Sequence, residues 1–150
     1  MEIKIEKLKK TDINLLSKLF FNDKSTSEFF FTQFKNEKQM IAVLTSAKKD
    51  LFYLIKVKEK ICGYMSLRGL DEGFNIPRFG IYIFSKFRNK GIGTKALELL
   101  LILCKKELNF TSIDLIVDKN NFKAIKIYKS QGFKLLNKEK NNLKMIKKIS

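Results

Sequence analysis

Residues 85–94 read Ser-Lys-Phe-Arg-Asn-Lys-Gly-Ile-Gly-Thr and stand between two segments of contrasting pattern. The preceding segment, 76–84, is rich in β-branched and aromatic residues, which is typical of a strand. In the following segment, 91–107, apolar residues recur at the three- and four-residue steps of one helix face. A strand, a basic loop with two glycines and a helix, in that order, predict a binding site for an anion.

The chemistry of this loop explains why an anion would bind there. The first N–H groups of a helix have no partner within the helix, and the helix dipole adds partial positive charge. Gly91 and Gly93 let a phosphate approach the backbone, while Arg88 and Lys90 add charge at the rim. Glycines that only serve the turn are the alternative. The loop lacks both the Gly-Lys-Ser/Thr ending of a Walker loop and the third glycine of a dinucleotide fingerprint.

A second informative segment is 121–133, which reads Asn-Phe-Lys-Ala-Ile-Lys-Ile-Tyr-Lys-Ser-Gln-Gly-Phe. It predicts a short helix over 121–131 with Gly132 as its C-cap, and either Asn120 or Asn121 as its N-cap. This segment resembles the Asn-x-x-Ala-x-x-x-Tyr-x-x-x-Gly-Phe stretch of the GNAT superfamily of N-acetyltransferases. The loop at 88–93 is similar to the Arg/Gln-x-x-Gly-x-Gly/Ala loop of the same superfamily.

The resemblance implies that acetyl-CoA is the co-substrate and that the loop amides bind its pyrophosphate. It also implies a strand beside the pantetheine arm, whose main-chain groups bond the cofactor, and a polar contact from the later helix. The implied cofactor contacts are Ile81, Tyr82, Ile83, Arg88, Asn89, Lys90, Gly91, Ile92, Gly93, Thr94 and Asn121.

The catalytic residues follow only in part from the resemblance. Tyr128 matches the family tyrosine that protonates the leaving thiolate, and a packing residue is the alternative reading. Many family members place a glutamate on the strand before the loop, but 76–84 contains no carboxylate. The nearest acids are Asp71 and Glu72, so each is a candidate general base or substrate contact. Two solvated turn carboxylates are the alternative.

The rest of the chain predicts an α/β (α+β) fold with a mixed, mostly antiparallel sheet flanked by about four helices. Further strands are expected at 2–7, 51–57, 61–67, 112–117, 133–137 and 143–148, with helices after an N-cap at Thr11 and from near Asn36. The phenylalanines at 29, 30, 31 and 34 either belong to the core or line a substrate cleft. With 150 residues, 1–150 is expected to form a single N-acetyltransferase domain.

Composition excludes several classes of function. Because the chain has no histidine, Ser-His-Asp and Cys-His catalysis are excluded, and the two cysteines alone do not make a zinc site, so no metal is expected. The net charge of +16 comes mostly from lysines spread over the chain, with Arg68, Arg78 and Arg88 as the only arginines. That pattern does not favour specific nucleic-acid binding, because arginine is the residue suited to bidentate phosphate and base contacts.

We expect a cytoplasmic protein, because no apolar run approaches the roughly 20 residues that span a membrane and the N-terminal residues show no signal-peptide core. A monomer or a homodimer is expected. The acceptor is expected to be a small-molecule amine. The turn at 68–75 is similar to that of acetyltransferases acting on amino sugars in surface-polysaccharide pathways, but other amines stay open. An inactive CoA-binding sensor or scaffold and a basic nucleic-acid-binding module are the competing functions.

Overall fold

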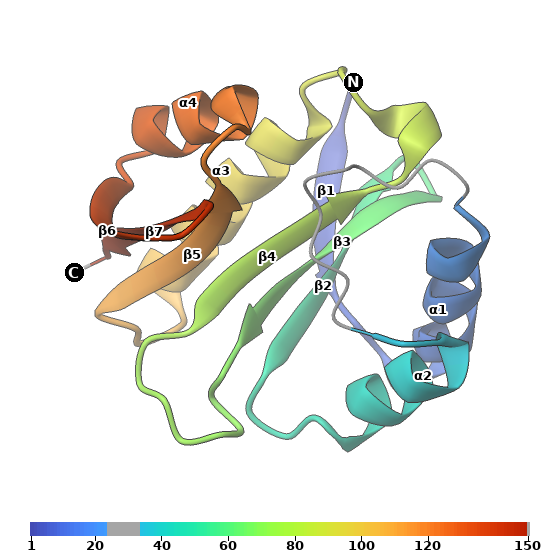
Figure 1. The fold of residues 1–150 in the computed structure, drawn as a ribbon. Coiled ribbons are helices and arrows are strands. Elements are labelled where there is room, and N and C mark those ends of the chain that lie inside the picture. The colour runs from blue at the N-terminus through green and yellow to red at the C-terminus, as the bar shows by residue number, and fades with distance from the viewer. Residues whose placement is uncertain (24–33, 150) are drawn as a thin grey trace.

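A single sheet runs through the part of the chain that this computed structural model describes, residues 1–23 and 34–149. Its strand order is β1-β2-β3-β4-β5-β7-β6 (Figure 1). The strands are β1 (Ile3–Lys7), β2 (Leu51–Val57), β3 (Lys60–Arg68), β4 (Arg78–Ile83), β5 (Ser112–Asp118), β6 (Lys134–Glu139) and β7 (Asn142–Lys148). The helices are α1 (Ile13–Asn22), α2 (Glu37–Ser46), α3 (Ile92–Lys106) and α4 (Phe122–Ser130), with 3-10 turns η1 (Lys10–Asp12) and η2 (Ser85–Phe87).

Helices cover both faces of the sheet and create two apolar cores. Strand β2 shows the alternation: Tyr53 and Ile55 pack in the core under α3, whereas Phe52 and Leu54 pack in the core under α1 and α2. Because both faces are covered, β2 is buried at consecutive positions and does not alternate between apolar and polar residues. Helices α1 and α2 lie on one side of the sheet and α3 and α4 on the other (Figure 1).

Strands β4 and β5 are parallel, whereas the other neighbouring strands are antiparallel. Their register contains one pair, Arg78 with Asp114, and the Asp114 N–H donates to the Pro77 carbonyl at 3.1 Å. Strand β4 nevertheless stays paired with β3 as far as Ile83. Beyond Arg78, the edge of β4 that faces β5 therefore carries main-chain groups without a strand partner among the described residues.

The predicted fold class is confirmed, since the sheet is mixed and mostly antiparallel and four α-helices flank it within the described residues. The ends of two helices differ from the prediction. Thr11 lies inside η1, and Asp12 is the N-cap of α1, so the predicted Thr11 cap is wrong. Gln131 is the C-cap of α4, and Gly132 follows it with φ 95°, the usual glycine position just beyond a cap.

The phenylalanine cluster is described only at its end. Phe34 is buried in the core of α1 and α2, which agrees with the core alternative for that residue. The predictions for 29, 30 and 31 lie outside the described residues.

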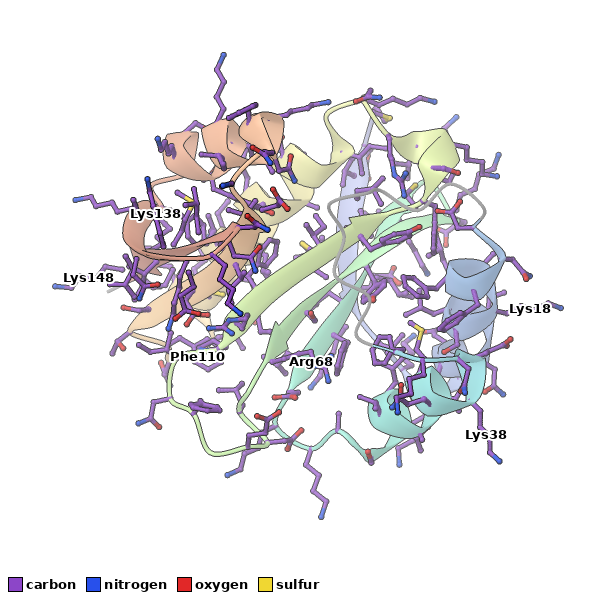
Figure 2. All side chains as sticks on the ribbon, viewed as in Figure 1. Lys18, Lys38, Arg68, Phe110, Lys138 and Lys148 are labelled. Atoms are coloured by element: carbon purple, nitrogen blue, oxygen red, sulfur yellow. The ribbon has the colours of Figure 1, made fainter. Side chains whose placement is uncertain are left out.

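The lysines extend from many elements. Figure 2 shows Lys18, Lys38, Lys138 and Lys148 projecting outward from α1, α2, β6 and β7 respectively. The positive charge is therefore spread around the fold. No helix among residues 1–23 and 34–149 is long and apolar enough to cross a membrane.

The β3–β4 contact leads to a test of stability. A Cβ at Gly63 would lie 2.1 Å from the Tyr82 carbonyl oxygen, so Gly63→Ala should lower the free energy of unfolding by about 1–3 kcal/mol. At Gly80 a Cβ would meet only the Ser66 hydroxyl, at 3.0 Å, and a side chain can move away. Gly80→Ala should therefore cost clearly less in urea unfolding followed by circular dichroism. Equal losses in the two variants would contradict this account of the strand contact.

Candidate functional site

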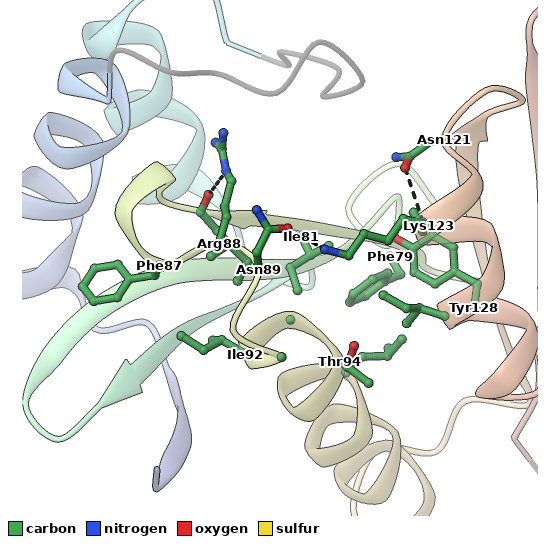
Figure 3. Close-up of a pocket in the computed structure, with 16 residues that line it drawn as sticks. Phe79, Ile81, Phe87, Arg88, Asn89, Ile92, Thr94, Asn121, Lys123 and Tyr128 are labelled. Carbon is green, nitrogen blue, oxygen red and sulfur yellow. Dashed lines mark hydrogen bonds between the residues drawn. The ribbon is translucent and has the colours of Figure 1, made fainter.

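The loop after β4 borders a cavity of about 280 Å³ between β4, the start of α3 and helix α4, here called the α3 cavity (Figure 3). Of the predicted cofactor contacts, those lining it are Ile81, Ile83, Arg88, Asn89, Gly91, Ile92, Gly93, Thr94 and Asn121. Tyr128 also lines it. The structure therefore brings together the two sequence segments that carried the resemblance.

The loop has the backbone of an anion site. Asn89 has φ 61° and Gly91, the N-cap of α3, has φ 77°. The left-handed conformation costs a residue with a Cβ about 1–2 kcal/mol, which explains the glycine at the second position. The first bond within the helix runs from the Lys95 N–H to the Gly91 carbonyl at 3.2 Å. The N–H groups of 92–94 precede this bond and are available to an anion.

Apolar side chains of β4 form one wall of the cavity. Phe79, Ile81 and Ile83 line it because alternate residues of a strand face the same side. Tyr82 faces the opposite side, is 3% exposed and packs edge-on against Phe20 at 4.8 Å between ring centroids. The predicted contact of Tyr82 with the cofactor is one of its main chain, which lies along this wall, so the prediction does not depend on where the side chain packs.

The two loop cations differ in how they relate to the cavity. The Nε of Arg88 donates to the Ile83 carbonyl at 2.9 Å, and its guanidinium lies 5.3 Å from the centre of the Tyr82 ring (Figure 3). Its Nη2 is 3.6 Å from Oδ2 of Asp23. The charged end of Arg88 is thus turned back toward β4, and Lys90 is exposed and does not line the cavity. The backbone amides of 92–94 are therefore the loop groups best oriented to donate to an anion.

Asp23, which the sequence did not single out, binds the start of the loop that follows β4. Its carboxylate accepts hydrogen bonds from the Tyr82 hydroxyl at 2.6 Å, the Ser85 N–H at 3.0 Å and the Ser85 hydroxyl at 2.6 Å. Burial opposes its ionisation, but the Ser85 and Tyr82 bonds and the Arg88 charge outweigh burial, so the pKa of Asp23 is lowered from 3.8. A carboxylate at the C-terminal end of a helix interacts unfavourably with the helix dipole. Its position after a predicted helix was therefore the one signal in the sequence that Asp23 binds something outside that helix.

Helix α4 closes the other wall of the cavity. The Asn121 side chain accepts a hydrogen bond from the Ala124 N–H at 3.3 Å, so Asn121 is the N-cap and its rival Asn120 is not. Lys123 donates to the side-chain oxygen of Asn89 and thereby joins α4 to the loop (Figure 3).

Tyr128 is held on this wall by aromatic packing. Its ring lies edge-on to those of Phe79 and Phe133, with centroids 6.3 and 5.8 Å apart. Burial raises the pKa of Tyr128 to about 12, so the phenol is protonated at neutral pH. Its hydroxyl makes no hydrogen bond to any residue that the structure describes. The packing alternative explains the position of the ring and leaves the hydroxyl able to donate.

Comparison with known sequences identifies the family. The sequence profile of the Acetyltransferase (GNAT) family matches residues 13–133. This chain belongs to the GNAT acetyltransferase family. The crystal structure of a GNAT-family acetyltransferase from Streptococcus pneumoniae superposes with a TM-score of 0.76 and 20% identity, covering 99% of this chain and 100% of the other. At that identity the superposition supports the GNAT fold.

Two curated relatives differ in the acceptor that their names give. An L-amino acid N-acetyltransferase of Escherichia coli K12 is 31% identical over 61 residues, which cover 41% of this chain and 38% of the relative. A spermidine N(1)-acetyltransferase of the same strain is 31% identical over 81 residues, which cover 54% of this chain and 44% of the relative. The matched part of this GNAT chain thus spans less than half the length of these relatives.

The two candidate bases of this GNAT chain, Asp71 and Glu72, lie in different surroundings. The Asp71 carboxylate accepts hydrogen bonds from the N–H groups of Lys48 at 3.1 Å, Lys49 at 2.8 Å and Asp50 at 3.1 Å. The Lys49 bond is the largest influence that lowers the pKa of Asp71 from 3.8. These bonds connect the β3–β4 turn to the segment between α2 and β2. Because both carboxylate oxygens of Asp71 already accept main-chain hydrogen bonds, a structural role is favoured over that of a general base.

Glu72 instead lines a second cavity, of about 610 Å³, here called the Arg78 cavity. Its walls come from the β3–β4 turn and from the starts of β4 and β5, with Lys144 of β7. Alternation along β4 places the side chains of Arg78 and Phe79 on opposite faces of the sheet. The Arg78 cavity and the α3 cavity therefore lie against opposite faces, near the point where β4 and β5 part.

The Asp23 network predicts a pH-dependent stability. Asp23→Asn should lower the free energy of unfolding by about 1–3 kcal/mol at neutral pH, because hydrogen bonds to a buried charge are lost or weakened. The pKa of Asp23 is lowered in the folded state, so this stabilisation is present above pH 3.8 and is lost as the pH falls through the folded pKa.

Urea unfolding of the parent and of Asp23→Asn between pH 7 and 3 measures the difference between their free energies of unfolding. It should stay constant down to about pH 5 and shrink below the ordinary aspartate pKa. The exposed Glu139→Gln, which removes the same charge, should cost little at any pH. A difference that is unchanged at pH 3 would show that the charge of Asp23 does not carry the effect.

Proposed function

We propose that this protein transfers an acetyl group from acetyl-CoA to the nitrogen of a primary amine. The observation that carries the proposal is the α3 cavity, where free helix-start amides, a left-handed glycine and an apolar strand wall meet in a GNAT-family chain. These features fit CoA, because the amides of 92–94 suit a pyrophosphate and Phe79, Ile81 and Ile83 suit the pantetheine arm. The unpaired edge of β4 offers N–H and C=O groups to the amides of that arm.

The reaction sets three chemical requirements. The ammonium must first lose a proton, since only a neutral amine attacks a carbonyl. A bond then forms between nitrogen and the acetyl carbon, the carbon–sulfur bond breaks, and the nitrogen releases a second proton. One of the two protons ends on the CoA sulfur and the other in water. Acetyl-CoA supplies the activated acyl group, so the protein has to orient the reactants and move protons.

Tyr128 is our candidate for the proton donor at sulfur. Tyr128 lines the α3 cavity, and its hydroxyl is protonated throughout the neutral range. Its proton is held more tightly than that of an ordinary tyrosine, so the hydroxyl stabilises the developing thiolate first by hydrogen bonding and donates fully only as the bond to sulfur breaks.

We place the acceptor amine in the Arg78 cavity, on the opposite face from the CoA site. Strands β4 and β5 share one register pair, so beyond it no ladder joins them, and an amine from one face could meet a thioester from the other there. Glu72 lines this cavity and is the candidate to receive the ammonium proton, directly or through water. Asp71 is assigned to holding the turn. The small-molecule acceptors consistent with this arrangement include amino sugars and amino acids.

Filling the α3 cavity tests the cofactor site. Gly93 lines it, and a Cβ there would point toward Ile81 and Ile83 at 3.7 Å. Gly93→Val should lower acetyl-CoA affinity by about tenfold or more in calorimetry, because the side chain occupies space that the ligand needs. Lys90→Gln removes charge from an exposed loop position and should have a much smaller effect. Equal affinities of Gly93→Val and the parent would place CoA elsewhere.

Removing one hydroxyl tests the proton donor. Tyr128→Phe should lower kcat by about tenfold or more with acetyl-CoA affinity nearly unchanged, because the ring contacts remain. In the parent, ionisation of Tyr128 should not reduce kcat near pH 10, since burial raises its pKa to about 12. Thiol release measured between pH 7 and 10.5 in both proteins gives both results. Equal kcat values would reduce Tyr128 to a packing residue.

A CoA-binding sensor without turnover is the competing function. It predicts normal acetyl-CoA affinity and the same loss in Gly93→Val, but no thiol release with any amine.

A further inference from the structure

One wall of the Arg78 cavity is positively charged. The Asp114 carboxylate accepts hydrogen bonds from Nε of Arg78 at 3.0 Å and from its Nη2 at 3.3 Å, and the Lys144 Nζ lies 3.8 Å from Asp114 Oδ2. The Asp114 side chain is only 9% exposed, whereas those of Arg78 and Lys144 are 43% and 32% exposed. Two cations thus cover one buried carboxylate, so this wall has an excess positive charge and presents mainly cationic groups to the cavity.

The same cavity holds one acidic group on a different element. Glu72 comes from the β3–β4 turn, is exposed, and makes no side-chain hydrogen bond to a described residue. The cavity therefore offers a cationic wall on β4 and β7 and a single carboxylate on the turn. A ligand that carries both an anionic group and an ammonium group matches this arrangement, because charge-assisted hydrogen bonds form at both ends.

Apolar surface completes the cavity. Phe74 and Ile76 line it and are 62% and 37% exposed, so their side chains are accessible to a ligand. They suit the non-polar part of an acceptor, such as a side chain or the face of a sugar ring.

We propose that the acceptor is a primary amine that also bears a carboxylate or a phosphate. Arg78 and Lys144 bind the anion, and Glu72 faces the amine. The inference rests on the proposed function and names the substrate class of its acceptor site. A polyamine is disfavoured, because it would bring two or more positive charges toward the exposed Arg78 and Lys144.

Matched acceptor pairs test the inference at saturating acetyl-CoA. Glucosamine 6-phosphate is compared with glucosamine, L-phenylalanine with phenethylamine, and spermidine is run alongside. The anion-bearing member of at least one pair should have a kcat/KM about tenfold or more above its partner, and spermidine should be poor. The favoured pair shows whether the anion is a phosphate or a carboxylate.

Charge variants of β7 connect the preference to the cavity. Lys144→Gln removes one cation but keeps the Arg78–Asp114 pair, so it should reduce the preference by about threefold to tenfold through KM. Lys144→Arg should keep the preference, which guards against a folding defect. Lys148→Gln is the matched control, since it removes the same charge from the same strand at a position that projects outward (Figure 2).

The outcomes separate this inference from the proposed function. A preference that falls in Lys144→Gln but not in Lys148→Gln supports it. Spermidine or the neutral amines as the better acceptors, or equal effects of the two lysine variants, would overturn it while leaving the transferase function in place. Absence of thiol release with every amine would overturn the proposed function and the inference with it.

Discussion

The arrangement of the site depends on a single constraint, the parting of two parallel strands after one register pair. Arg78 and Asp114 are paired both in the β4–β5 ladder and through their side chains. Beyond them, β4 keeps its partner β3 but has no ladder to β5. The main chain there is open to a ligand with amide groups, while the ion pair at the junction faces the opposite side. One break in the sheet thus lies between the α3 cavity on one face and the Arg78 cavity on the other.

The loop that follows β4 depends on a carboxylate from a distant helix. Asp23 ends α1 and binds Tyr82 and Ser85, so it fixes the end of β4 and the start of η2 relative to each other. Arg88 is drawn toward the same carboxylate, which explains why the loop arginine contributes little charge to the cavity. The anion site therefore relies on oriented N–H groups at the start of α3, whose position does not change with side-chain rotamers.

Much of the fold and part of the site could be predicted because their causes are local. The apolar run at 51–57 predicted β2 with its observed ends. The sequence also placed the start of a helix near Asn36, the N-cap of α2, and offered Asn121 as a cap of α4. The same reasoning could not find contacts between residues far apart in the chain. Asp23 binds Tyr82 from the end of α1, 59 residues away in the chain, and Asp71 binds the main chain near Lys49. Neither pairing follows from a period or a cap. Sequence therefore located the glycine loop at the start of α3, but it could not give the direction in which the Arg88 side chain points.

Two adjacent acids in the β3–β4 turn show how the structure separates roles that the sequence could not. Asp71 binds the main chain of the α2–β2 connection, and Asp50 from that connection binds the N–H groups of Leu70 and Asp71 in return. This reciprocal clamp fixes a turn whose glycines would otherwise leave it flexible. Because the main chain of the turn is held, the backbone of Glu72 is fixed at the border of the Arg78 cavity. The lowered pKa of Asp71 is a consequence of this structural role, because the main-chain N–H groups that it binds stabilise its charged form.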